Sequence, residues 1–134
     1  MPRVLRRRRL PCDLAGAFDA FLAAVEPVER AKGSVVAAVP TGRSPGLPLA
    51  EALVGFEEGL REAQKRMPAW RVDRVEAEWA ACSAAVEESL GLAGSLRLEA
   101  PELGFEALLA AVGDLIAPLE AFGRAAERFR DLRE

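Results

Sequence analysis

The side chain most often used as a general base, as an activator of a nucleophile or as a metal ligand is missing, because the 134-residue chain contains no histidine. Catalytic triads and histidine-bearing metal sites are therefore excluded. A carboxylate-bridged pair of metal ions inside a helical bundle needs glutamates that project into the core. The candidate glutamates instead fall outside the apolar seams, where solvated helix faces are expected; they are Glu57, Glu58, Glu62, Glu76, Glu78, Glu87 and Glu88. We predict a protein that is not an enzyme and holds no metal or cofactor.

The two cysteines are far apart in sequence and have neither metal-ligand nor redox spacing. We expect reduced thiols, as in a cytoplasmic protein. Cys82 falls on an apolar seam with no base nearby in sequence, which favours a buried and unreactive thiol over a nucleophile. Cys12 precedes the first predicted helix, so we expect it to be exposed and to react with an alkylating reagent.

Arginine has the clearest functional implication of any residue type here. Arg3 and the run from Arg6 to Arg9 make residues 1–12 a basic arm, predicted to be flexible, that suits phosphate backbones, anionic lipid or an acidic protein. The alternative is a solubilising tail without a binding role. Two further arginines would join the arm at one pole of the predicted fold. The candidate polyanion-binding residues are Arg6, Arg7, Arg8, Arg9, Arg71 and Arg74.

Two tryptophans and one loop have both a binding and a structural interpretation. Trp79 lies on an apolar seam and is expected in the core, whereas Trp70 is either a plug for the end of the bundle or an exposed anchor for a partner. Residues 40–48 read PTGRSPGLP, which excludes a helix. This segment has neither the phosphate-loop pattern nor a preceding strand, so we interpret it as a connector, with contact to a ligand as the alternative.

The elements that must position these residues are helices. Hydrophobic residues make up 51% of the chain and charged residues 29%, tyrosine is absent, and alanine, leucine, glutamate and arginine dominate. Apolar residues repeat after three and four positions within 13–39, 48–67, 73–91 and 101–132, and this spacing predicts four helices in a single domain, 13–134. We expect an all-α, antiparallel up-down four-helix bundle with long, kinked first and last helices.

Local signals refine these boundaries. Asp13 is expected to cap the first helix, and Asp73 with Glu76 fits a capping box at the start of the third. Pro27 frees the carbonyl of residue 23, and Pro118 frees that of residue 114, so kinks are predicted at both places. Gly91 and Gly94 leave open whether the third helix ends at 91 or continues to 98.

The predicted topology makes the molecule electrically bipolar. Residues 1–22, 61–79 and 120–134 share one pole, which carries 14 basic and 10 acidic side chains, while the remainder carries 4 and 11. No stretch approaches the length of about 20 apolar residues that a membrane helix needs, so membrane insertion is not expected. Pro11 and Asp13 follow the arginine run almost directly, so no long apolar stretch comes after it, and the N-terminus is a poor signal peptide.

Three functions remain. The leading expectation is a cytoplasmic helical interaction module that binds a protein partner or itself, as a homodimer, because the long first and last helices should overhang the second and expose apolar surface. The alternative is binding of nucleic acid or another polyanion through the basic pole. The third is a small-molecule site in the bundle core beside Pro27 and Pro118.

Overall fold

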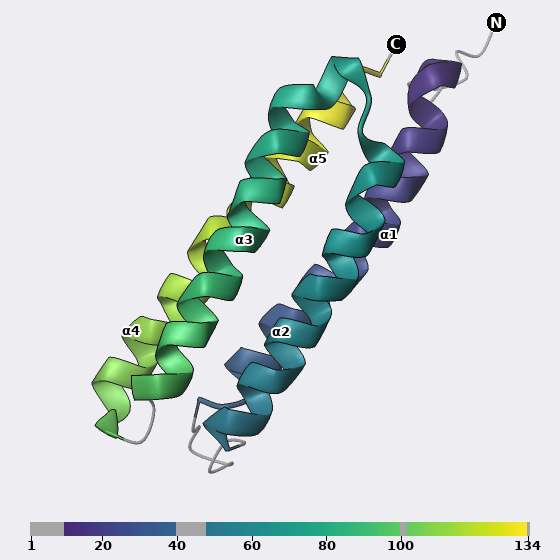
Figure 1. Ribbon diagram of the computed structural model, residues 1–134. Coiled ribbons are helices and arrows are strands. Elements are labelled where there is room, and N and C mark those ends of the chain that lie inside the picture. Colours follow the sequence, from purple (N-terminus) through teal and green to yellow (C-terminus); the bar gives the residue numbers. More distant parts are fainter. Residues whose placement is uncertain (1–9, 40–47, 100–101, 134) are drawn as a thin grey trace, which may run out of the picture.

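A computed structural model of the chain describes residues 10–39, 48–99 and 102–133. Its secondary structure in these ranges consists of helices, without a strand. The elements are α1 (Cys12–Val36), α2 (Leu49–Arg66), η1 (Met67–Trp70), η2 (Asp73–Val75), α3 (Glu76–Glu99), α4 (Phe105–Ile116), η4 (Ala117–Glu120) and α5 (Ala121–Asp131). Four helices, with α4, η4 and α5 counted as one, pack against each other (Figure 1). The all-α prediction is confirmed, while the run Arg6 to Arg9 and residues 40–47 lie outside the described residues.

The helices α1 and α2 approach each other closely because small residues line their contact. A Cβ atom added at Gly59 would lie 2.7 Å from the carbonyl oxygen of Pro27 and 2.8 Å from the Cβ of Ala31. One added at Gly55 would lie 2.8 Å from the hydroxyl of Ser34. At Gly59 the obstacle includes backbone, so a side chain there would push the two helices apart.

The helix α1 continues through Pro27 without interruption. Proline has no N–H to donate, so the carbonyl of Ala23 loses its partner within the helix. The guanidinium of Arg66 replaces that partner, because its Nη1 donates to the Ala23 oxygen at 2.7 Å. A side chain of α2 therefore satisfies the backbone group that the proline frees in α1.

The predicted helix over 101–132 is interrupted at Pro118. The α-helical part begins at Phe105, turns into the 3₁₀ segment η4 at Ala117 and resumes as α5. Beside this interruption, the fully buried hydroxyl of Ser89 donates to the carbonyl oxygen of Leu115 at 2.8 Å. As at Pro27, a neighbouring helix supplies a hydrogen bond where the chain departs from regular helix.

Two predicted caps are wrong, and the third helix follows the longer of the two courses that the sequence left open. The residue before α1 is Pro11, and Asp13 lies in the first turn without a capping hydrogen bond. The capping box also fails: the cap before η2 is Val72, and the Glu76 carboxylate accepts hydrogen bonds from Arg71 instead. Gly91 and Gly94 do not end the third helix, since α3 runs to Glu99.

The two ends of the molecule differ in packing. We call the end at which α1 begins and α5 ends the closed end, and the opposite end, at which α3 ends and α4 begins, the open end (Figure 1). Toward the closed end, the ring of Phe21 lies within 6.4 Å of four other aromatic rings, centroid to centroid. These rings are Phe18, Trp70, Phe122 and Phe129. The aromatic cluster joins α1, η1 and α5.

Candidate functional site

Exposed apolar side chains concentrate at the open end. Seven large apolar side chains in the described residues are more than a third exposed: Leu22, Val36, Val54, Leu92, Leu98, Phe105 and Leu109. All but Leu22 belong to the segments that meet at the open end, which are the end of α1, the start of α2, the end of α3 and the start of α4. Leu98 is 86% exposed and Phe105 55%. We call these six residues the open-end patch.

The helix α4 explains why the patch exists. Its sequence, FEALLAAVGDLI, contains only two charged residues, Glu106 and Asp114, yet only Val112 and Leu115 are buried. A helix that is apolar on nearly every side is normally surrounded by protein or lipid. Here most of that apolar surface faces outward, so among the described residues α4 has no neighbour on its outer side.

The segments that form the open end also carry many carboxylates. Five of them are exposed and form no ion pair within the described residues: Glu51, Glu58, Glu99, Glu102 and Glu106. The described part of the half that contains this end, 23–39, 48–60, 80–99 and 102–119, carries eleven acidic and three basic residues. The surface is therefore both apolar and strongly negative.

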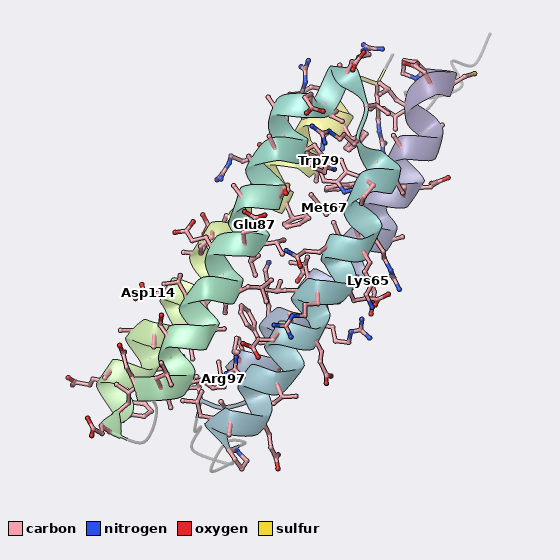
Figure 2. All side chains as sticks on the ribbon, in the orientation of Figure 1. Lys65, Met67, Trp79, Glu87, Arg97 and Asp114 are labelled. Carbon is pink, nitrogen blue, oxygen red and sulfur yellow. The ribbon has the colours of Figure 1, made fainter. Side chains whose placement is uncertain are left out.

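One glutamate near this end is buried, although the sequence predicts a solvated position for it. Glu57 is only 6% exposed and accepts a hydrogen bond from Arg97 at 2.5 Å, so the expectation of a solvated position is wrong. Figure 2 shows Arg97 on the part of α3 that lies alongside α2. A buried carboxylate needs such a partner, and this ion pair ties α2 to α3 beneath the exposed patch.

Of the candidate polyanion-binding residues, only Arg71 and Arg74 lie in the described part of the chain. Arg6 to Arg9 lie outside it. The Arg71 guanidinium donates to the Glu76 carboxylate at 2.7 Å and lies 4.1 Å from the centre of the Trp79 ring. This contact raises the pKa of Arg71 and lowers that of Glu76. Arg74 is exposed, but residues 10–22, 61–79 and 120–133 together carry nine basic and nine acidic side chains.

Trp70 is part of the core, so the expectation of an exposed partner anchor is wrong. Its side chain is fully buried, and its ring meets that of Phe21 edge-on at 4.8 Å. The alternative interpretation, a plug in the bundle, agrees with this position. Trp79 is only partly buried, and its indole N–H donates to the Met67 carbonyl at 2.7 Å. Both tryptophans therefore hold η1 in place.

The two thiols lie in opposite environments. Cys82 is fully buried, and burial raises its pKa to about 12, so the thiol stays protonated and weakly nucleophilic. Cys12 is exposed at the start of α1. Within residues 10–39, 48–99 and 102–133 no group of three or more cysteine, aspartate or glutamate side chains is arranged to hold a metal ion. None of the helices in these ranges is both long and apolar enough to cross a bilayer.

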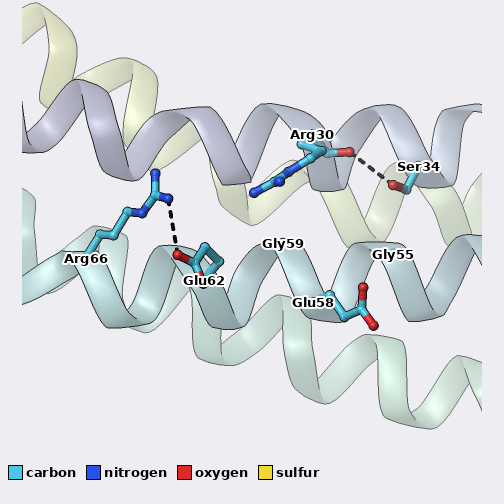
Figure 3. Close-up of a pocket in the computed structure, with 7 residues that line it drawn as sticks. All are labelled: Arg30, Ser34, Gly55, Glu58, Gly59, Glu62 and Arg66. Atoms are coloured by element: carbon cyan, nitrogen blue, oxygen red, sulfur yellow. Dashed lines mark hydrogen bonds and ion pairs between the residues drawn. The ribbon is translucent and has the colours of Figure 1, made fainter.

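Two hollows lie along α1. One, of about 390 Å³, opens between α1 and α5 and has an apolar floor that includes Phe21, Val25, Leu119 and Phe122. We call it the α1/α5 groove. The other, of about 340 Å³, lies between α1 and α2 and is polar (Figure 3). In the polar hollow Arg66 pairs with Glu62 at 3.2 Å, and Arg30 pairs with Glu26 outside it at 3.4 Å.

The open-end patch was only partly visible in the sequence. Phe105 stands on the predicted seam of the last helix, and such a position predicts burial rather than exposure. Leu98 belongs to the third helix only if that helix continues past Gly91, which the sequence left open, so its position predicted neither burial nor exposure. The usable signal was the composition of 105–116, where two charged residues in twelve leave too few polar side chains to cover an outer face.

Comparison with known proteins assigns no family to the chain. No family model matches it, and no curated protein or solved structure shows a significant match. We therefore base the proposed function on the difference between the two ends of the molecule.

Proposed function

We propose that the protein is a non-enzymatic helical interaction module of the cytoplasm, which self-associates as a homodimer through the open-end patch. The observation that supports this proposal is the exposure of Phe105 and Leu109 on α4, the most apolar of the described helices, and of Leu98 near the end of α3. Each Å² of apolar surface removed from water contributes about 25 cal/mol, so covering such side chains favours association. A second copy of the chain is the partner we expect to bury these side chains, because symmetric dimers are the commonest oligomers.

We further propose an antiparallel up-down bundle, bent at Pro27 and Pro118, as the scaffold for this surface. The course of the chain in Figure 1 supports it, since α1 ends where α2 begins and α3 ends where α4 begins. Such a bundle places four helix ends together at the open end, and each of them contributes to the patch. Residual dipolar couplings that orient α4 and α5 along one axis would contradict the bend at Pro118.

The test compares the mass of variant proteins in solution. Sedimentation equilibrium at micromolar concentration is expected to show a dimer for the unaltered chain and a monomer for Leu98→Ser combined with Phe105→Ser. The matched control is Leu22→Ser, because Leu22 is 49% exposed but lies away from the open end. The control is expected to remain dimeric. A dimer that survives the double substitution but is lost in the control would overturn the proposal.

Binding of a small apolar molecule in the α1/α5 groove is a second candidate function. The lining of the groove includes Leu119, the neighbour of Pro118, but neither Pro118 nor Pro27 itself, and the groove's volume falls at the lower end of the range for ligand sites. Gly123 lines it, and a Cβ there would meet no atom within 4 Å. Gly123→Leu is therefore expected to abolish binding of an apolar fluorescent dye, whereas Gly113→Leu, at an equally unhindered glycine outside the groove, leaves binding unchanged. Equal binding by both variants would exclude this function.

A further inference from the structure

Charge divides the molecule in the same way as exposed apolar surface does. The described half around the open end carries eleven acidic and three basic residues, and one of those three, Arg97, is already paired with Glu57. The described residues of the other half are balanced. A surface that is apolar and negative selects a partner that is apolar and positive.

Residues 1–9 of the chain have this chemistry. They read MPRVLRRRR, so five arginines accompany Met1, Val4 and Leu5. Beyond this arginine run, no stretch of nine residues in the sequence combines so many basic side chains with so few acidic ones. The segment precedes Leu10 and α1, and it is therefore attached to the molecule at the closed end.

The arginine run cannot reach the open end of its own chain. Arg6 is four residues from Leu10, so even an extended backbone carries it no further than about 14 Å. The helix α1 has 25 residues and spans about 37 Å between the two ends. A contact between the basic segment and the open-end patch must therefore join two molecules.

We propose that the open-end patch of one copy receives residues 1–9 of a second copy. In this contact Val4 and Leu5 cover Leu98 and Phe105, while the arginines pair with carboxylates of the open-end segments, among them Glu99, Glu102 and Glu106. Two copies that lie antiparallel make the contact twice, which closes the assembly as a symmetric dimer and leaves no patch unfilled. The inference rests on the proposed self-association and specifies what covers the patch.

The test is a charge-reversal rescue in the full chain, read by sedimentation equilibrium. One variant carries Arg6→Glu, Arg7→Glu, Arg8→Glu and Arg9→Glu, another carries Glu99→Lys, Glu102→Lys and Glu106→Lys, and a third carries all seven substitutions. Each partial variant is expected to weaken dimerisation by at least about tenfold, and the combined variant to recover most of it, because the reversed charges attract again. Raising the salt concentration from 50 to 300 mM is expected to weaken the unaltered dimer as well.

A matched control reverses three acidic residues of the closed end: Asp19→Lys, Asp73→Lys and Glu127→Lys. This control is expected to leave the dimer intact. A dimer that is indifferent to the arginine reversals but lost in Leu98→Ser with Phe105→Ser would overturn the inference while retaining the proposed function. A chain that is monomeric throughout would overturn both.

A mobility-shift experiment with duplex DNA tests the remaining alternative, which is that residues 1–9 bind a nucleic acid. The variant with Glu99→Lys, Glu102→Lys and Glu106→Lys is expected to bind DNA no more tightly than the closed-end control does. Tight, salt-sensitive DNA binding that requires Arg6 to Arg9, by a chain that stays monomeric without DNA, would assign the segment to a nucleic acid and overturn the inference.

Discussion

The closed end and the open end of this molecule use similar residue types for different purposes. At the closed end Phe21, Trp70 and Phe129 meet one another and are almost completely buried. At the open end Phe105, Leu98 and Leu109 face outward on helices of the same bundle. The difference teaches that an apolar seam guarantees neither burial nor exposure. What decides is whether neighbouring segments pack over the seam, as η1 and α5 pack against Phe21 of α1 at the closed end.

The largest expected effect comes from replacing one phenylalanine by alanine at each of the two ends of the bundle. Phe129→Ala is expected to lower the free energy of unfolding by about 3–5 kcal/mol, because it leaves a cavity in the aromatic cluster. Phe105→Ala is expected to change it by no more than about 0.5 kcal/mol when the protein is dilute, since its ring is mainly in water. Urea denaturation measures both values. Similar losses at the two positions would remove the distinction between the ends.

The next effect tests the close approach of α1 and α2. Gly59→Ala is expected to destabilise the protein by about 1–3 kcal/mol, because the new methyl group meets the Pro27 carbonyl and Ala31. Gly113→Ala is the control, since its Cβ meets no atom within 4 Å and alanine favours a helix over glycine. The control is expected to gain up to about 1 kcal/mol. Thermal unfolding monitored by circular dichroism measures both, and a stabilised Gly59→Ala protein contradicts the packing.

A smaller effect concerns the ion pair beneath the patch. Arg97→Ala leaves the buried Glu57 carboxylate without its partner and is expected to cost about 2 kcal/mol, less than for a fully buried pair because the Arg97 side chain is half exposed. Adding Glu57→Leu to Arg97→Ala removes the unpaired charge and is expected to restore most of the loss. Denaturant titration of the two variants measures this recovery. If Glu57→Leu lowers the free energy of unfolding further, the Glu57 carboxylate has stabilising contacts besides Arg97.

The smallest effect is the dependence of stability on pH at Glu76. The Arg71 guanidinium holds the pKa of this carboxyl below its usual value of 4.5. A lowered pKa in the folded state stabilises the protein above pH 4.5, and this contribution is lost as the pH falls through the folded-state pKa. Carbon-detected NMR titration is expected to give a midpoint below 4.5 that returns to the ordinary value in Arg71→Gln. An unchanged midpoint in that variant would mean that Arg71 is not the cause.

The sequence was sufficient for the helical class because its seams repeat over long ranges. Leu53, Phe56 and Leu60 are buried as their spacing predicts, and α2 begins and ends within one residue of the predicted range. The buried, inert position of Cys82 also followed from its seam. These features depend on local periodicity, which a single sequence displays.

Features that depend on contacts between distant residues could not be derived in this way. The helix α3 continues past Gly91 because packing against its neighbours outweighs the low helix propensity of glycine. The burial of Glu57 depends on Arg97, forty residues away, and Trp70 is enclosed by rings from two other segments. Helix capping also depends on contacts that the local pattern does not show. The Glu76 carboxylate accepts hydrogen bonds from the Arg71 guanidinium instead of from a backbone N–H at the start of the helix.

The most direct test of self-association through the open end is a map of amide chemical shifts at increasing concentration of the unaltered protein. We predict concentration-dependent shifts at Leu92, Leu98, Phe105 and Leu109, together with residues 1–9, and constant shifts in the aromatic cluster. A spectrum that does not change with concentration, or shifts confined to the α1/α5 groove, would contradict the assignment of the open end as the interaction surface.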